Sequence, residues 1–178
     1  MPSISLETGL KKIIECTIDA LQPADWDQVR SIYLEGIETG QATFETEAPD
    51  WEKWDAGHLH VCRWVARADE VVLGWAVLSP VSSRPVYAGV AESSLYVREN
   101  LRGLGVGRAL LEALVKCSES HGIWTLQAGI MAENESSLAL HRKCGFREVG
   151  SRERIGQLNG VWRNVILLER RSQVVGAE

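Results

Sequence analysis

The segment Arg102-Gly103-Leu104-Gly105-Val106-Gly107 lies between a strand-like run that ends at Leu95-Tyr96-Val97 and an amphipathic helix predicted to begin at Arg108. Three glycines in this place leave backbone N–H groups uncovered at the start of a helix, where the positive end of the helix dipole also lies. The segment is therefore predicted to bind a phosphate or pyrophosphate group through its backbone.

Two other phosphate-binding loops do not fit this segment. A P-loop requires Gly-Lys-Ser/Thr, and no lysine follows Gly107. A dinucleotide-binding loop requires Gly-x-Gly-x-x-Gly, and no choice of first glycine puts a glycine at its last position. The pattern that remains is Arg-x-x-Gly-x-Gly, formed by Arg102, Gly105 and Gly107. A glycine-rich turn without a ligand is the alternative interpretation.

The composition excludes several classes of protein. A chain of 178 residues, 45% of them hydrophobic, is long enough for one domain with a sizeable core. Its formal net charge of −5 argues against nucleic-acid binding, which requires a basic surface. No apolar run reaches the roughly 18 residues of a membrane span, and the N-terminal residues lack the basic and apolar regions of a signal peptide. We therefore expect a cytoplasmic protein that binds neither nucleic acid nor membranes.

The four cysteines, Cys16, Cys62, Cys117 and Cys144, are widely spaced and form no Cys-x-x-Cys pair. They are predicted to be small, unpaired, buried hydrophobic residues in a reducing compartment, with Cys117 and Cys144 structural. The run 58–62 contains two histidines and a cysteine, but a polar loop leading into a strand is the better interpretation than a metal site. No metal is expected.

Hydrophobic periodicity and turn residues predict seven strands and four helices without an internal repeat or linker. The expected strands are 13–18, 61–68, 71–79, 87–97, 124–131, 146–155 and 161–169. The expected helices are 23–38, 49–57, 108–121 and 134–144. This order predicts a mixed α/β (α+β) fold, because neither an all-parallel doubly wound sheet nor a barrel has it.

The order of elements, together with the Arg-x-x-Gly-x-Gly pattern, resembles the GNAT acetyltransferase superfamily over residues 13–170. The resemblance implies a central, mixed, mostly antiparallel, splayed sheet flanked by helices. It leaves 1–12 as an N-terminal extension and 171–178 as a C-terminal tail. It also implies acetyl-CoA as the cofactor, although Leu104 replaces a basic residue that relatives often carry. The residues expected to hold acetyl-CoA are Leu95, Val97, Arg102, Gly103, Leu104, Gly105, Val106, Gly107, Arg108, Asn134, Ser137 and Lys143.

Glu92 lies in the strand that leads into the glycine-rich segment. Regular alternation places Glu92, Ser94 and Tyr96 on one face of that strand, and an acid on the solvent face of a sheet is the alternative. Acyl transfer to an amine requires a base, because only the unprotonated amine attacks the thioester. Glu92 is therefore predicted to be the general base.

His141 falls one helical turn after Ser137, and without further context it is a surface or interhelix histidine. The run 140–146, Leu-His-Arg-Lys-Cys-Gly-Phe, resembles a GNAT pattern in which a tyrosine stands where this chain has His141. Together with Ala91-Glu92-Ser93, it resembles the phosphinothricin acetyltransferase family. That family acetylates phosphinothricin, methionine sulfoximine, methionine sulfone or related amino acids. The resemblance implies that His141 is the catalytic partner of Glu92 and helps to protonate the leaving thiolate.

The expected acceptor pocket follows from further matches to this family, in residues 42–45, 84–87 and 160–162. They imply that Phe44, Arg84, Tyr87 and Trp162 line it. We add Trp75, for which core packing is the alternative. The functional interpretation of Arg84 is a fork that binds a carboxylate, against a solvated surface arginine.

The sequence thus predicts an N-acetyltransferase of a small amino acid or analogue, and by resemblance a homodimer. One alternative is an acetyltransferase of protein N-termini or lysines, which would need an open groove. The other is a non-catalytic acyl-CoA-binding regulatory domain.

Overall fold

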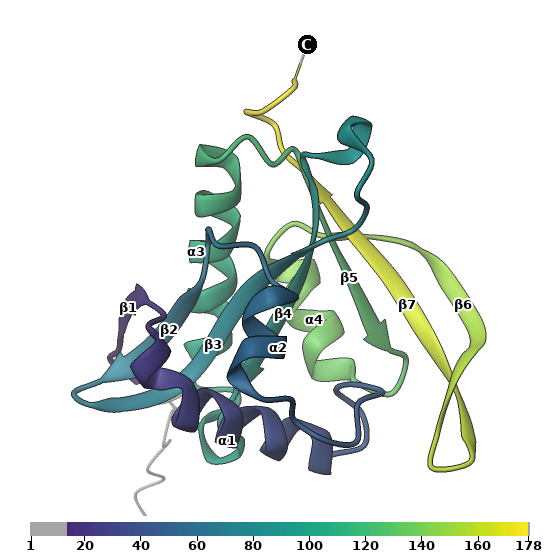
Figure 1. Cartoon of the computed structure of the whole chain (residues 1–178). Coiled ribbons are helices and arrows are strands. Elements are labelled where there is room, and N and C mark those ends of the chain that lie inside the picture. Colours follow the sequence, from purple (N-terminus) through teal and green to yellow (C-terminus); the bar gives the residue numbers. More distant parts are fainter. Residues whose placement is uncertain (1–13, 178) are drawn as a thin grey trace, which may run out of the picture.

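The computed structural model describes residues 14–177, and in it seven strands form one sheet (Figure 1). The strands are β1 (Thr17–Ala20), β2 (Trp64–Ala68), β3 (Val71–Pro80), β4 (Val90–Val97), β5 (Thr125–Met131), β6 (Arg147–Leu158) and β7 (Val161–Arg171). They lie in the order β1-β2-β3-β4-β5-β7-β6, and only β4 and β5 pair in parallel. The predicted mixed, mostly antiparallel sheet is confirmed.

Four α-helices pack on this sheet: α1 (Trp26–Glu38), α2 (Trp51–Ala56), α3 (Val106–Ser120) and α4 (Glu135–Lys143). Three short 3-10 helices lie in the connections: η1 (Pro23–Asp25) between β1 and α1, η2 (Pro85–Tyr87) between β3 and β4, and η3 (Glu99–Leu101) between β4 and α3. All four predicted helices are present, and the first begins with η1. Within residues 14–177 no helix is both long and apolar enough to cross a bilayer.

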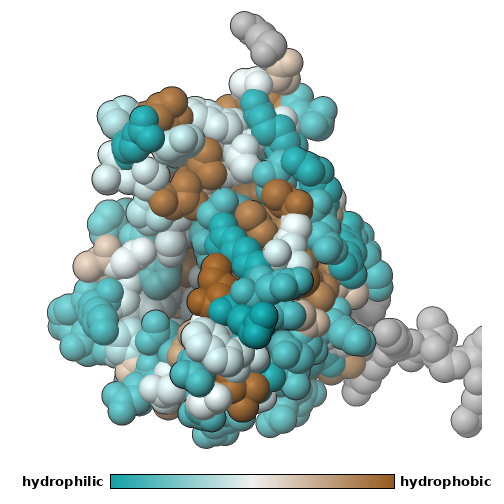
Figure 2. All heavy atoms as spheres, turned by 90° about the vertical axis from the view of Figure 1, so that its right-hand side faces the viewer, coloured by the Kyte–Doolittle hydropathy of each residue, from teal (hydrophilic) through white to brown (hydrophobic). Residues whose placement is uncertain are grey.

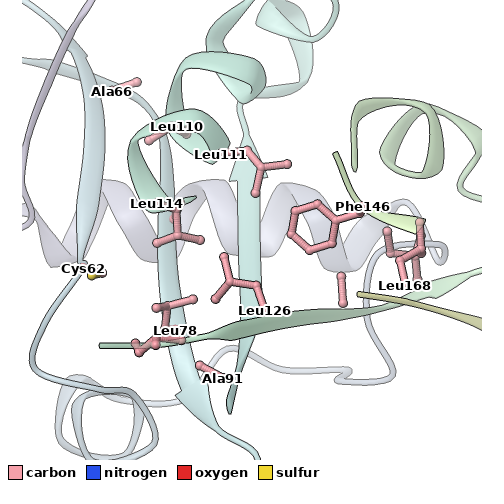
Figure 3. Close-up of a cluster of buried hydrophobic side chains, with 14 of the residues drawn as sticks. Cys62, Ala66, Leu78, Ala91, Leu110, Leu111, Leu114, Leu126, Phe146 and Leu168 are labelled. Atoms are coloured by element: carbon pink, nitrogen blue, oxygen red, sulfur yellow. The ribbon is translucent and has the colours of Figure 1, made fainter. Parts of the chain in front are cut away.

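Two apolar clusters hold the helices to opposite faces of the sheet. Trp54 of α2 and two residues of α1 pack against β2 and β3 on one face. On the other face, Leu110, Leu111 and Leu114 of α3 lie over the sheet near Leu126 and Phe146 (Figure 3). Burial of such aliphatic side chains contributes about 1.5–3 kcal/mol each. These contacts fix the position of α3 on the sheet, and therefore the position of the glycine-rich segment at its N-terminus.

Several predicted boundaries move in the structure. The strand expected from residue 87 begins at Val90, because Pro85 starts the 3-10 turn η2 and its ring fixes φ in a turn conformation. The first strand is Thr17–Ala20, paired with β2, rather than 13–18. The predicted extension 1–12 lies outside the described residues, and β7 continues to Arg171, into the predicted tail.

β4 and β5 separate soon after they meet. Their pairing is limited to Val90 with Thr125, Ala91 with Leu126 and Glu92 with Gln127. Beyond Glu92, β4 continues along β3, whereas β5 continues along β7. The sheet therefore splays in the middle, immediately beyond the predicted base.

The prediction that all four cysteines are unpaired is wrong for two of them. Cys62, in the loop before β2, forms a disulfide with Cys117 in the last turn of α3. Their Cα atoms are 5.5 Å apart, within the range that a disulfide spans. The packing of α3 against β2 brings together cysteines that are 55 positions apart, which spacing alone does not indicate. Cys16 and Cys144 are unpaired as predicted, and burial raises the pKa of both thiols.

Candidate active site

A cavity of about 240 Å³, which we call the cleft cavity, lies where β4 and β5 separate. Residues 92–96 of β4 and 128–131 of β5 form two of its walls. The loop residues Ala42, Thr43 and Phe44 and the helix α4 complete it. The predicted residues Glu92, His141, Asn134, Ser137, Leu95 and Phe44 therefore all line one cavity.

Glu92 is half-buried at the point where the strands part. Its Oε2 accepts a hydrogen bond from Nε2 of Gln127 at 3.4 Å, across the last β4–β5 pair. Gly129 of β5 lies beside the carboxylate, since a Cβ added there would be 3.9 Å from Oε1. The carboxylate is thus held at the mouth of the opening by β5 and retains oxygen lone pairs that can accept a proton.

His141 faces the same cavity from α4 and is only 4% exposed. Its Nδ1 lies 2.9 Å from the carbonyl oxygen of Ser137, and a carbonyl only accepts, so Nδ1 carries the hydrogen. Burial lowers the pKa of His141, in spite of this hydrogen bond. The ring is therefore neutral near pH 7, and its Nε2 has a free lone pair. In this state His141 accepts a proton before it can donate one.

Asn134 caps α4. Its Oδ1 accepts from the backbone N–H of Ser137 at 3.2 Å, and its Nδ2 donates to the carbonyl of Gln41 at 3.3 Å. The first bond caps the helix, and the second ties the loop after α1 to α4. Lys143 is exposed at the end of α4 and lines neither cavity.

The glycine-rich segment has the conformation that its glycines permit. Gly103 and Gly105 have φ values of +78° and +95°, in the left-handed region that disfavours residues with a Cβ. Gly105 is the N-cap of α3 and offers no side-chain acceptor to the first-turn N–H groups. Arg102 and Arg108 are exposed on either side. Free N–H donors flanked by two guanidinium groups fit a pyrophosphate.

The remaining predicted cofactor residues lie around this helix start. A Cβ added to Gly107 would be 3.2 Å from Leu140 and 3.5 Å from Val97, so α3, α4 and β4 converge here. Val106 is buried, and Leu104 accepts a backbone hydrogen bond from Ile14. An extended ligand running from the helix start toward Glu92 would lie along the part of β4 that β5 leaves free.

A second cavity, of about 360 Å³, lies on the α1–α2 side of β4, and we call it the aromatic cavity. It shares Ser94 and Tyr96 with the cleft cavity. Burial raises the pKa of Tyr96 and of Tyr33, so both phenols stay protonated at neutral pH. Its other lining residues are Glu45, Thr46, Glu47, Ala48, Pro49, Lys53, Trp54, His58 and Trp75. The cavity therefore combines aromatic walls with charges of both signs.

The predicted acceptor residues are only partly brought together. Phe44 lines the cleft cavity, and Trp75 lines the aromatic cavity as a buried wall whose Nε1 donates to Val29. Arg84 and Tyr87 stack on each other in and beside η2, with 5.5 Å between guanidinium and ring centroid. Trp162 is 57% exposed on the β6–β7 hairpin. These last three line neither cavity, and Figure 1 places η2 at the opposite end of the molecule from the hairpin tip.

Sequence reasoning did not assign Lys53, His58, Tyr33 and Tyr96 to a site. A signal was present for Tyr96, which alternates with Glu92 along β4. No local pattern marks the other three, which come together only through packing of α1 and α2. Figure 2 shows that the face carrying β6 and β7 is largely hydrophilic, with apolar patches between hydrophilic side chains.

Known proteins resemble this chain over most of its length. The model of the acetyltransferase (GNAT) family matches residues 26–146. A phosphinothricin N-acetyltransferase from Alcaligenes faecalis is 31% identical over 165 residues, covering 87% of this chain and 82% of the relative. A phosphinothricin acetyltransferase from Sinorhizobium meliloti, solved in complex with AcCoA, superposes with a TM-score of 0.83 at 28% identity, covering 93% and 92% of the two chains.

A solved ribosomal-protein-alanine N-acetyltransferase from Brucella melitensis is also similar, with a TM-score of 0.80 and 30% identity, covering 88% of this chain and 99% of the other. The family model covers well over half of the chain, and the sheet, helices and glycine-rich segment agree with it. This protein therefore belongs to the GNAT acetyltransferase family.

Proposed function

We propose that this protein is an acetyl-CoA-dependent N-acetyltransferase of a small amino acid or analogue, of the phosphinothricin, methionine sulfoximine or methionine sulfone type. The observation that carries the proposal is the meeting of Glu92 and His141 in one cavity at the split of β4 and β5. The similarity to phosphinothricin N-acetyltransferases supports the substrate class.

Acetyl-CoA would supply the acetyl group as a thioester. The uncapped N–H groups at the start of α3, with Arg102 and Arg108, would hold its pyrophosphate. The free part of β4, near Leu95 and Val97, would present backbone donors toward the cleft cavity, which suits stabilisation of a developing oxyanion.

Glu92 would take the proton of the acceptor amine, directly or through one water. His141 would act as a second acceptor through its unprotonated Nε2. It could return a proton to the departing thiolate only after receiving one, because burial keeps the ring neutral. The two residues would therefore pass one proton from amine to thiolate without a covalent acyl-enzyme.

The aromatic cavity is our proposed acceptor site. Lys53 would pair with the substrate carboxylate, while Glu45 or Glu47 would attract its ammonium group. Its volume of about 360 Å³ suits an amino acid better than a folded protein substrate. A homodimer and a cytoplasmic location remain predictions.

The test is a thiol-release assay with acetyl-CoA against free amino acids, their analogues, short peptides and lysine side chains. We expect methionine sulfone, methionine sulfoximine or phosphinothricin to give the highest kcat/KM. Faster turnover of a peptide beginning with alanine would favour the protein N-terminal alternative, which the Brucella melitensis structure represents. Binding of acetyl-CoA without turnover of any acceptor would favour a regulatory domain.

A further inference from the structure

A sulfur–nitrogen cluster lies outside both cavities, at the last turn of α3. The cluster consists of the disulfide between Cys62 and Cys117 and the imidazole of His121. Nδ1 of His121 is 3.5 Å from Sγ of Cys117 and 3.8 Å from Sγ of Cys62. Cys62 is 5% exposed, Cys117 is half-buried and His121 is exposed. In the described part of the chain, it is the one group of three His, Cys, Asp or Glu side chains whose nitrogen, sulfur or carboxylate oxygen atoms lie within 4.8 Å of one another.

We propose that Cys62 and Cys117 form a reversible redox modification site, opened by small dithiols and closed by small disulfides. Thiol–disulfide exchange starts at the sulfur that a thiolate can reach, and Cys117 is the more exposed of the two. His121 places its Nδ1 beside both sulfurs, with the carbonyl of Cys117 and the hydroxyl of Ser120 as its nearer partners. Its Nδ1 lies 2.9 Å from the carbonyl of Cys117, so that nitrogen carries a hydrogen.

The exchange balances in two steps. A thiolate of the dithiol attacks Sγ of Cys117, which breaks the disulfide and releases Cys62 as a thiolate. The second thiolate of the reductant then attacks its own sulfur in the mixed disulfide, which releases Cys117 as a thiolate and leaves the reductant as a cyclic disulfide. Two electrons pass to the protein, and each cysteine takes up one proton. Oxidation by a small disulfide is the reverse.

His121 has a definite task in this exchange. The C-terminal end of α3 carries partial negative charge, which disfavours a thiolate there. The Nδ1–H of His121, which the carbonyl of Cys117 accepts at 2.9 Å, can share its hydrogen with a departing sulfur 3.5 or 3.8 Å away, and this sharing offsets part of that effect. Cys16 and Cys144 have no such donor among the hydrogen bonds of the described residues, and burial raises the pKa of both thiols. Cys62 and Cys117 are therefore the reactive pair of cysteines, and replacing the unpaired Cys16 is the matched control.

The disulfide also anchors a wall of the aromatic cavity. Arg63, the neighbour of Cys62, donates to the carbonyl of Leu59 at 2.6 Å and to that of His58 at 2.9 Å, and pairs with Asp55. His58 and the adjoining helix α2 line the cavity. Reduction releases one end of this tied loop, and we expect weaker acceptor binding. This consequence rests on the proposed function, whereas the redox site does not.

The redox site is tested with the whole protein in buffers of varied oxidised-to-reduced dithiothreitol ratio, because dithiothreitol is a small dithiol that forms a cyclic disulfide. Alkylation of free thiols followed by mass spectrometry gives the fraction of linked Cys62–Cys117. We expect one reversible transition in folded protein, unchanged in Cys16→Ser and absent in Cys62→Ser. His121→Gln should slow reduction about tenfold at unchanged thermal midpoint. A bond that yields only on unfolding, or a reduced protein that takes up one Zn²⁺ in place of reoxidising, would overturn the proposal.

A separate assay measures the effect on activity. KM for the acceptor should rise on reduction and fall again on reoxidation, with kcat little changed, and Cys62→Ser should keep the higher KM in both buffers. If no acceptor is turned over, the proposed function fails while the dithiothreitol titration still decides the redox site. If turnover occurs and KM ignores a completed reduction, the link to the cavity wall is wrong.

Discussion

Glu92 and His141 lie on different elements, a strand and a helix, yet they face the same small cavity. Replacing Glu92 by glutamine keeps the shape of the side chain and removes its ability to accept a proton. We expect Glu92→Gln to lower kcat about a hundredfold or more, with little change in acetyl-CoA affinity. Steady-state kinetics over a range of pH, with calorimetry for the cofactor, measures both. An unchanged rate across that range would reduce Glu92 to a surface acid.

The buried imidazole of His141 makes a prediction about stability. Burial lowers the pKa of His141 in the folded protein, so the unfolded chain binds more protons below its ordinary pKa of about 6.5. The contribution of this residue to the free energy of unfolding is therefore complete above about pH 6.5 and is lost as the pH falls toward the lowered pKa. Urea unfolding from about pH 5 to about pH 8 should give a smaller slope in His141→Gln than in the native protein.

The control for this measurement is His58, whose pKa burial also lowers. His58 makes the free energy of unfolding change with pH in the same direction, and this contribution is common to the native protein and to His141→Gln. The difference between the two profiles therefore belongs to His141, whatever the absolute stability of the variant. Parallel profiles would mean that folding does not lower the pKa of His141, and the argument that burial keeps its ring neutral would be wrong.

At the scale of elements, the start of α3 depends on a backbone that only glycine adopts easily. Gly105 has a φ of +95° and is the N-cap whose neighbours would hold the pyrophosphate. In the native protein, acetyl-CoA at about a hundred times its Kd should stabilise by about 2.7 kcal/mol, a rise of roughly 5–10 °C in Tm. We expect Gly105→Val to abolish that rise, because a branched side chain strains this conformation and covers the N–H groups.

The matched control is Gly150→Ala in β6, where the added Cβ meets nothing within 4 Å and φ is not positive. This variant should keep the full shift with acetyl-CoA, as measured by thermal denaturation. NADH and ATP at equal concentration should raise the Tm of the native protein and of Gly150→Ala by less than acetyl-CoA does. A larger shift with NADH would contradict the assignment of the cofactor.

Elements with strong periodicity were predictable, and contacts between elements were not. The stripe of Leu110 and Leu114 identifies α3 from sequence, and Gly105 and Gly107 identify its start. The disulfide of Cys62 with Cys117 arises from the packing of α3 on β2, which no local pattern encodes. The aromatic cavity is likewise a product of packing.

The candidate site divides in the same way. The sequence motif places Glu92 and His141, because both belong to patterns with fixed spacing along one strand and one helix. The acceptor side escapes this reasoning, because residues of α1, α2 and the loop between them meet β4 only in three dimensions. Arg84 was predicted to bind the carboxylate, but η2 leaves it exposed outside both cavities of this chain.

At the scale of the whole molecule, two cations are candidates to bind the carboxylate of the proposed substrate. Lys53 lines the aromatic cavity, whereas Arg84 lines neither cavity of its own chain and would have to act from the other subunit of the predicted homodimer. A charge-assisted hydrogen bond contributes about 1.5–3 kcal/mol, and solvent around exposed Lys53 reduces it. We therefore expect Lys53→Ala to raise KM for methionine sulfone about tenfold, and Arg84→Ala to leave it nearly unchanged.

The control for this comparison is the amide of the same amino acid, which lacks the carboxylate. The amide should be a poor substrate of the native protein. Lys53→Ala should hardly affect the KM for the amide, because the amide has no carboxylate with which Lys53 could pair. The opposite result, a KM that rises only in Arg84→Ala, would assign the carboxylate to Arg84. It would also require a second subunit at the site, which sedimentation of the active species would then have to detect. Equal activity on acid and amide, with both variants harmless, would remove the carboxylate contact altogether and favour acetylation of protein N-termini.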